Sequence, residues 1–100
     1  MIKLSWTGLA EQRLSSIIDK IAEDNKIAAE NLLKTILKKV RLLEQFPEMG
    51  RIVPELNHKF TRELIESNFR IIYRYNLNQD EIIILSIRHV KELLIKKEIK

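Results

Sequence analysis

Three arginines and one histidine in the C-terminal half are the side chains best suited to binding or chemistry. Arg70 and Arg74 share one face of an alternating stretch with Ile72 between them, and Arg88 and His89 close the next apolar stretch. Such cations favour an acidic partner, either nucleic acid or an acidic protein segment. An imidazole with a pKa near neutrality can act as a general acid or base, although a histidine at a strand end is more often an edge residue.

These side chains must be positioned by residues 69–89, which read as two strands joined by a tight turn. Alternation places two sets of side chains on opposite faces of the first strand, namely Phe69, Ile71, Tyr73 and Tyr75 against Arg70, Ile72 and Arg74. The polar run 76–80 supplies turn residues. Strict alternation in the second strand gives Ile83, Leu85 and Ile87 one face and Ile82, Ile84, Ser86 and Arg88 the other.

One face of this hairpin is expected to stay open for a partner. Strict alternation places three isoleucines and three arginines on the face away from the predicted helices: Ile72, Ile82, Ile84, Arg70, Arg74 and Arg88. A half-apolar face of this kind can take an extended strand or an amphipathic helix from another protein. These six residues are therefore the predicted partner-binding set.

The N-terminal half predicts a short strand and two helices. Apolar residues alternate over residues 2–6, and Thr7 is a plausible N-cap for a following helix. Apolar residues then recur at helical spacing over residues 10–21 and 29–43, with a break at residues 24–25 that can cap the second helix. Two long helices joined by so short a turn make an antiparallel hairpin.

A DNA-reading helix-turn-helix is the alternative interpretation of the two helices. Their expected lengths of roughly 15 and 20 residues and their continuous apolar stripe favour packing against a core instead. Residues 47–59 carry both prolines and predict a loop, residues 61–65 predict a third hairpin strand, and the tail after His89 predicts a short C-terminal helix. The order predicts a single two-layer α+β domain over residues 1–100, with the helical hairpin on one face of a mostly antiparallel four-stranded sheet.

Composition narrows the class of protein further. The chain of 100 residues has 18 basic and 14 acidic residues, a net charge of +4, and no cysteine. Disulfides and thiolate metal sites are therefore excluded, and neither a metal nor a cofactor is expected. The N-terminus lacks the apolar core of a signal peptide, and no apolar run approaches the length of a membrane span. We expect a cytoplasmic protein with no membrane partner.

Three segments together resemble the RelE/ParE superfamily of toxins from type II toxin-antitoxin modules. They are WTGLAEQRL after the first strand, FPEMGRIVPEL in the loop, and RELIESNFRIIYRYNLNQDEIIILSIRHVKE, and they cover nearly the whole chain in order. The resemblance implies a fold in which the N-terminal strand lies beside the last strand. It also implies a small antitoxin whose disordered C-terminal segment folds on binding, and whose acidity would suit the net charge.

The resemblance leaves three functions open. In the ribosome-dependent mRNA endonuclease branch, Arg70 would offset charge on a scissile phosphate and His89 would act as acid or base. However, Thr61 and Glu63 stand where that branch has lysines, and a carboxylate repels phosphate. The ParE branch is more similar, which implies poisoning of DNA gyrase without active-site residues and contact with DNA only through the antitoxin. The third possibility is an inactive homologue that serves only as an antitoxin-binding co-repressor.

Overall fold

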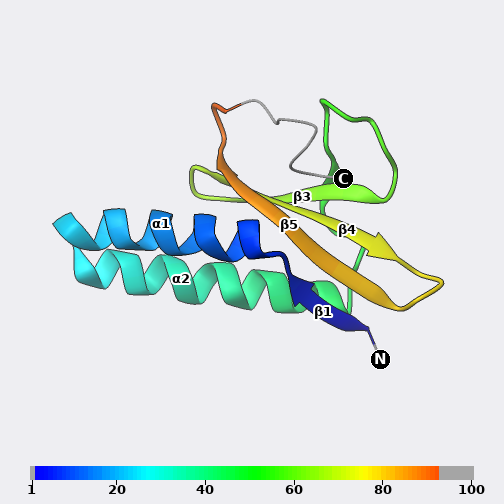
Figure 1. Cartoon of the computed structure of the whole chain (residues 1–100), viewed down its shortest axis with the longest axis horizontal. Coiled ribbons are helices and arrows are strands. Elements are labelled where there is room, and N and C mark those ends of the chain that lie inside the picture. Colours follow the sequence, from blue (N-terminus) through cyan, green and yellow to red (C-terminus); the bar gives the residue numbers. More distant parts are fainter. Residues whose placement is uncertain (1, 93–100) are drawn as a thin grey trace.

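The computed structural model describes residues 2–92 and places two helices against one mixed sheet (Figure 1). Its elements in chain order are β1 (Lys3–Trp6), α1 (Gly8–Asp24), α2 (Lys26–Arg41), the 3-10 turn η1 (Leu42–Glu44), β2 (Arg51–Ile52), β3 (Thr61–Glu66), β4 (Phe69–Asn76) and β5 (Glu81–His89). The predicted helix after His89 falls mainly on residues 93–100, which lie outside the described residues.

Side-chain caps begin both helices, as the sequence predicts. The Thr7 hydroxyl accepts a hydrogen bond from the Ala10 amide at 3.0 Å and donates one to the Leu85 carbonyl at 2.9 Å, which ties the start of α1 to β5. The Asn25 side chain accepts from the Ala28 amide at 3.0 Å and begins α2. The two helices therefore run as an antiparallel pair joined at one residue (Figure 1).

The sheet contains five strands in the order β1-β5-β4-β3-β2. β1 pairs with β5 in parallel, which confirms the expected position of the N-terminal strand, and the other neighbours are antiparallel. The four-stranded prediction omitted β2, whose two residues Arg51 and Ile52 pair with Glu63 and Arg62 of β3. A strand of two residues is too short to show alternation, so only its pairing reveals it.

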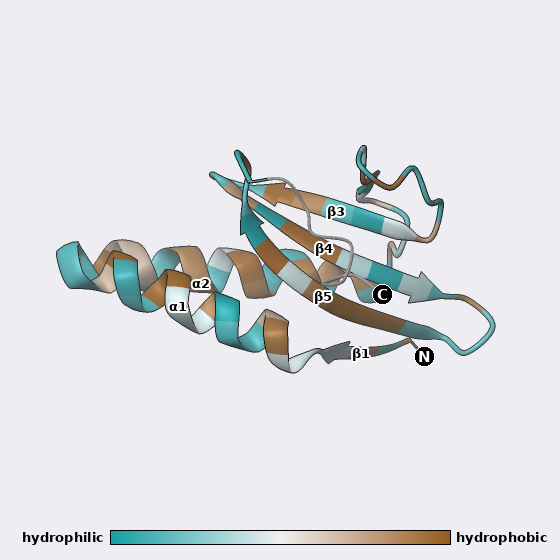
Figure 2. Ribbon diagram, turned by 45° about the horizontal axis from the view of Figure 1, so that its top comes forward, coloured by the Kyte–Doolittle hydropathy of each residue, from teal (hydrophilic) through white to brown (hydrophobic). Residues whose placement is uncertain are grey.

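The main core lies between the helices and one face of the sheet. Residues of β4 and β5 face α1 and α2 here, and Figure 2 shows that much of β5 is hydrophobic. The buried members of this cluster are Ala10, Ile36, Val40, Leu43, Leu64, Ile71, Tyr73, Tyr75, Ile82, Ile84 and Ile87. The helical hairpin therefore packs on the sheet. Within the described residues, no helix is long and apolar enough to cross a membrane.

Ile82 and Ile84 were predicted on the open face, and this placement is wrong. Both are fully buried in the helix-facing core. The reason is a β-bulge: Ile72 pairs with Ser86 while Tyr73 pairs with Ile84, so Leu85 has no partner residue on β4. One extra residue reverses the facing of every side chain beyond it.

The face away from the helices is covered at its centre by the same chain. Val53 and Leu56, from the connection between β2 and β3, pack there against Ile72, Ile83 and Leu85 in a second apolar cluster. Ile72 and Val53 are fully buried. The prediction that Ile72 lies in an open groove is therefore wrong, because Val53 and Leu56 pack over it.

Candidate functional site

Arg70, the first residue that chemistry singles out, is held by two carboxylates. Its Nε donates to Glu63 Oε1 at 2.6 Å, and its two terminal nitrogens donate to the two oxygens of Glu55 at 2.7 Å each. A further bond runs from Nη1 to the Glu92 carbonyl at 3.1 Å. Since the Arg70 side chain is only 6% exposed, this guanidinium is enclosed by carboxylates and has no open side for a phosphate.

Glu63 connects this arginine to a second one. Its other oxygen accepts from Arg51 Nε at 2.6 Å, so one fully buried carboxylate bridges β2 and β4 from β3. The hydrogen bonds to Glu55 raise the pKa of Arg70 above its ordinary value; burial opposes this rise and Glu63 adds to it. Arg51, Glu63, Arg70 and Glu55 are hereafter called the arginine-carboxylate network.

The structure does not bring Arg70 and His89 together as a catalytic pair. Phe69 pairs with His89 and Arg70 pairs with Arg88, so the histidine and Arg70 point to opposite faces of the sheet. The His89 ring packs edge-on against Phe69, with 5.8 Å between ring centroids, and its Nδ1 accepts from the Lys91 amide at 3.2 Å. Within residues 2–92, no group of three or more acidic or histidine side chains could hold a metal ion.

Arg74 and Arg88 occupy opposite ends of the sheet. Arg74 is half-buried and its Nε donates to the Thr61 hydroxyl at 3.3 Å. Arg88 is largely buried and forms an ion pair with Glu92 at 2.8 Å. The six residues predicted to form one binding surface are therefore not together. Ile82 and Ile84 lie in the core, Ile72 is covered and Arg70 is enclosed, while Arg74 and Arg88 lie at opposite ends of the sheet.

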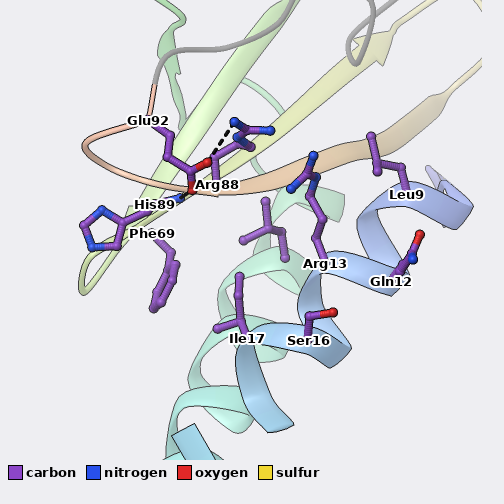
Figure 3. Close-up of a pocket in the computed structure, with 10 residues that line it drawn as sticks. Leu9, Gln12, Arg13, Ser16, Ile17, Phe69, Arg88, His89 and Glu92 are labelled. Carbon is purple, nitrogen blue, oxygen red and sulfur yellow. Dashed lines mark hydrogen bonds and ion pairs between the residues drawn. The ribbon is translucent and has the colours of Figure 1, made fainter. Parts of the chain in front are cut away.

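Arg88 and His89 instead line a groove between α1 and the end of β5 (Figure 3). The groove has a volume of about 300 Å³, and Arg13 points into it from α1 towards β5 (Figure 3). Leu9, Ile17 and Phe69 supply apolar walls, and Glu92 adds a carboxylate at one side (Figure 3). This hollow is termed the α1/β5 groove.

The α1/β5 groove runs beside the C-terminal part of β5, which extends beyond its pairing with β1. β1 pairs with residues 81–84 of β5 and ends at Trp6. Among the described strands, none lies beside residues 86–89 on the side away from β4. The backbone of this segment is enclosed, because Ser86 and Ile87 are buried and the His89 amide donates to Glu92 Oε1 at 3.1 Å.

The residues that sequence reasoning missed are the partners of Arg70 and the α1 wall of the groove. Glu55 lies in a loop, where no periodic pattern indicates its direction, and Arg13 reads as an exposed helical cation. The sequence does indicate Glu63 as a partner of Arg70, because the two side chains share a face across the paired strands β3 and β4. A carboxylate on an arginine-bearing face predicts an ion pair.

Comparison with known proteins identifies the family. The model of the ParE toxin of the type II toxin-antitoxin system parDE matches residues 4–94. The chain belongs to the ParE toxin family. This membership confirms the resemblance stated from the sequence, since the match spans the first strand, both helices and the remaining strands of the sheet.

Two solved structures are similar to this ParE-family chain. A chain of the chromosomal ParDE toxin-antitoxin system from P. aeruginosa has 26% identity and a TM-score of 0.70, and the match covers 91% of this chain and 98% of that one. A chain of the toxin-antitoxin complex RelBE2 from Mycobacterium tuberculosis has 18% identity and a TM-score of 0.60, with 88% and 96% covered, and shows the shared fold. No protein with a curated description matches this sequence.

Proposed function

We propose that this ParE-family protein is a toxin that inhibits growth by poisoning DNA gyrase and is neutralised by a cognate antitoxin protein. The observation that carries the proposal is the family match over residues 4–94. Support comes from the similarity to a chain of the ParDE system of P. aeruginosa over nearly the full length of both chains.

The arginine-carboxylate network supports a binding protein over an RNA-cleaving enzyme. A nuclease needs a cation that can meet a developing phosphate charge and an acid or base within reach of the same atoms. Arg70 is occupied by Glu55 and Glu63, and His89 points to the other face of the sheet. The mRNA endonuclease is therefore the less favoured function.

The α1/β5 groove is the surface that we assign to the antitoxin. Its two arginines, Arg13 and Arg88, carry the positive charge that suits an acidic segment, and His89 adds a polar ring to the lining. Arg88 is thus retained from the predicted binding set. Arg74 lies at the other end of the sheet and takes no part in this assignment.

One experiment compares the two targets directly. Purified protein is added to a DNA gyrase supercoiling reaction and, in parallel, to ribosomes programmed with an mRNA. We expect inhibited supercoiling, accumulated cleaved DNA and an intact transcript. Addition of the antitoxin encoded beside the toxin in its genome should restore supercoiling.

Each other result contradicts part of the proposal. Cut mRNA with normal supercoiling would assign the protein to the nuclease class. No effect in either reaction, together with tight antitoxin binding, would identify an inactive homologue that acts as a co-repressor. An active toxin that the antitoxin fails to restrain would overturn the assigned partner.

A further inference from the structure

A second hollow lies at the opposite end of the sheet from the α1/β5 groove. It has a volume of about 490 Å³ and is formed where the loop before β3 meets the turn between β4 and β5. Both segments lie at the same end of the sheet (Figure 1). Its lining residues are His58, Phe60, Arg74, Tyr75, Asn76, Leu77 and Asn78, and it is termed the hairpin cleft.

An aromatic platform forms one wall of the hairpin cleft. Phe60 is 36% exposed, and its ring is held edge-on against the buried Tyr75 with 5.4 Å between centroids. The His58 ring supports Phe60 from a second direction at 6.0 Å. Leu77, which is 53% exposed, adds apolar surface from the turn. A partly exposed ring that is fixed by its neighbours offers a flat surface on which another ring can stack.

The charges around this platform are positive. Arg74 lines the cleft, and Lys59 Nζ lies 5.1 Å from the centroid of the Phe60 ring. Among the residues that the structure describes, the lining of the hairpin cleft contains no aspartate or glutamate, whereas that of the α1/β5 groove includes Glu92. Asp80 and Glu81 belong to the same hairpin but do not line the cleft. The described lining of the cleft therefore presents positive charge to a phosphate.

Two side chains present donors whose orientation is set by local bonds. His58 Nδ1 accepts from the Phe60 amide at 3.3 Å, which leaves Nε2 to carry the proton of the neutral ring. Asn76 Oδ1 accepts from the amides of Asn78 and Gln79 at 3.0 and 3.3 Å, which leaves its amide nitrogen as a donor. Both groups can donate to a base edge or to a phosphate oxygen.

From this arrangement we propose that the hairpin cleft binds single-stranded nucleic acid, with one base stacked on Phe60 and the adjoining phosphates near Arg74 and Lys59. An exposed aromatic ring beside cations is the combination by which proteins hold unpaired bases. This binding is additional to the proposed function and does not depend on whether the target is gyrase. It modifies the expectation that the protein meets nucleic acid only through its antitoxin.

Fluorescence anisotropy with a labelled ten-nucleotide dT strand at low salt tests the proposal. We expect binding to the wild-type protein. The variant Phe60→Ala should weaken it roughly 5- to 150-fold, the range of one base-aromatic stack. Phe46→Ala is the matched control, because Phe46 is an exposed phenylalanine, at 57%, that does not line the cleft. Circular dichroism checks that both variants are folded.

A second pair of variants tests the phosphate contact. Arg74→Gln should flatten the dependence of log affinity on log salt by about 0.7, and Arg41→Gln, at an exposed position of α2, should leave it unchanged. A strand of rU and the mononucleotide dTMP are measured beside dT. Equal affinity for dTMP would mean that a free nucleotide is the ligand.

The proposal is overturned by absent binding of both strands at low salt. It is also overturned if Phe60→Ala and Phe46→Ala weaken binding equally, since the affinity would then come from general charge. Gyrase poisoning can persist in either case, so failure of this inference is distinct from failure of the proposed function.

Discussion

At the residue scale, Glu63 is the centre of the buried polar structure. It is fully buried and accepts from both Arg51 and Arg70, while Glu55 completes the enclosure of Arg70. A buried ion pair contributes little over an apolar replacement, but the loss of one member leaves a buried charge without compensation. The network therefore makes the fold depend strongly on each of its members.

Glu63→Gln should lower the free energy of unfolding by about 3 kcal/mol, because the buried Arg70 loses one of its two charge partners. Urea unfolding followed by circular dichroism measures this loss. Glu66→Gln removes the partner of Lys39 in a more exposed ion pair and should cost less than about 1 kcal/mol. Equal losses in the two variants would show that burial of Glu63 adds nothing.

Tyr73 gives the protein a predicted sensitivity to alkaline pH. Burial raises the pKa of its hydroxyl from 10.0 to about 12, and the hydroxyl donates to the Pro47 carbonyl at 2.7 Å and accepts from the Gly50 amide at 3.0 Å. Because the folded pKa exceeds the unfolded one, the unfolded state loses its proton first as pH rises. Stability is therefore complete below pH 10 and falls between pH 10 and 12.

The expected loss over this interval is about 2 to 3 kcal/mol, from about 1.4 kcal/mol per pKa unit. Unfolding by urea at pH 9 and at pH 11.5 measures it. Tyr73→Phe should be less stable at pH 9, because the bonds to Pro47 and Gly50 are lost, and should show a smaller further decrease at pH 11.5. The same decrease in both proteins would assign the pH dependence to other groups.

At the element scale, the bulge in β5 decides which isoleucines are inside. Ile84 lies under the helices and is fully buried. Ile84→Lys should therefore leave the protein unfolded at 25 °C, because a lysine charge cannot be buried there without a partner. Ile65→Lys is the control, since Ile65 of β3 is 39% exposed. A folded Ile84→Lys protein, seen by circular dichroism, would contradict the assigned register.

Regular elements were predicted well because their side-chain period is uninterrupted. The caps Thr7 and Asn25 and both faces of β4 agree with the structure. The predicted orientation of the side chains of β5 was wrong because no residue type marks the extra residue Leu85 as a bulge. The burial of Ile72 was not predicted for a related reason, since a loop has no side-chain period that indicates where it packs.

At the scale of the whole molecule, the two hollows lie at opposite ends of the sheet, beside the two ends of β5. Arg13 and Arg88 line the α1/β5 groove, while Arg74 and His58 line the hairpin cleft. Each hollow therefore has at least one arginine in its lining. The two hollows share no lining residue, so the antitoxin proposed for the groove and the nucleic acid proposed for the cleft would occupy separate surfaces.

Antitoxin binding should depend on the charge of the α1/β5 groove. Arg13→Glu is expected to weaken the affinity for the antitoxin at least tenfold, because it places a carboxylate opposite an acidic segment. Lys34→Glu makes the same charge change at an exposed position of α2 and should have less than a threefold effect. Titration calorimetry at 50 and 300 mM salt measures both, with weaker binding expected at high salt. Equal effects of the two variants would exclude the groove.

The extra residue at Leu85 also constrains how this chain can change over evolutionary time. A deletion of one residue between Ser86 and Ile83 would turn half of β5 over, exposing isoleucines and forcing other side chains beneath the helices. Lineages that lose it must therefore alter several neighbouring positions together. In an alignment with relatives that lack this residue, a gap placed at the wrong position will align inward-facing residues of β5 with outward-facing ones.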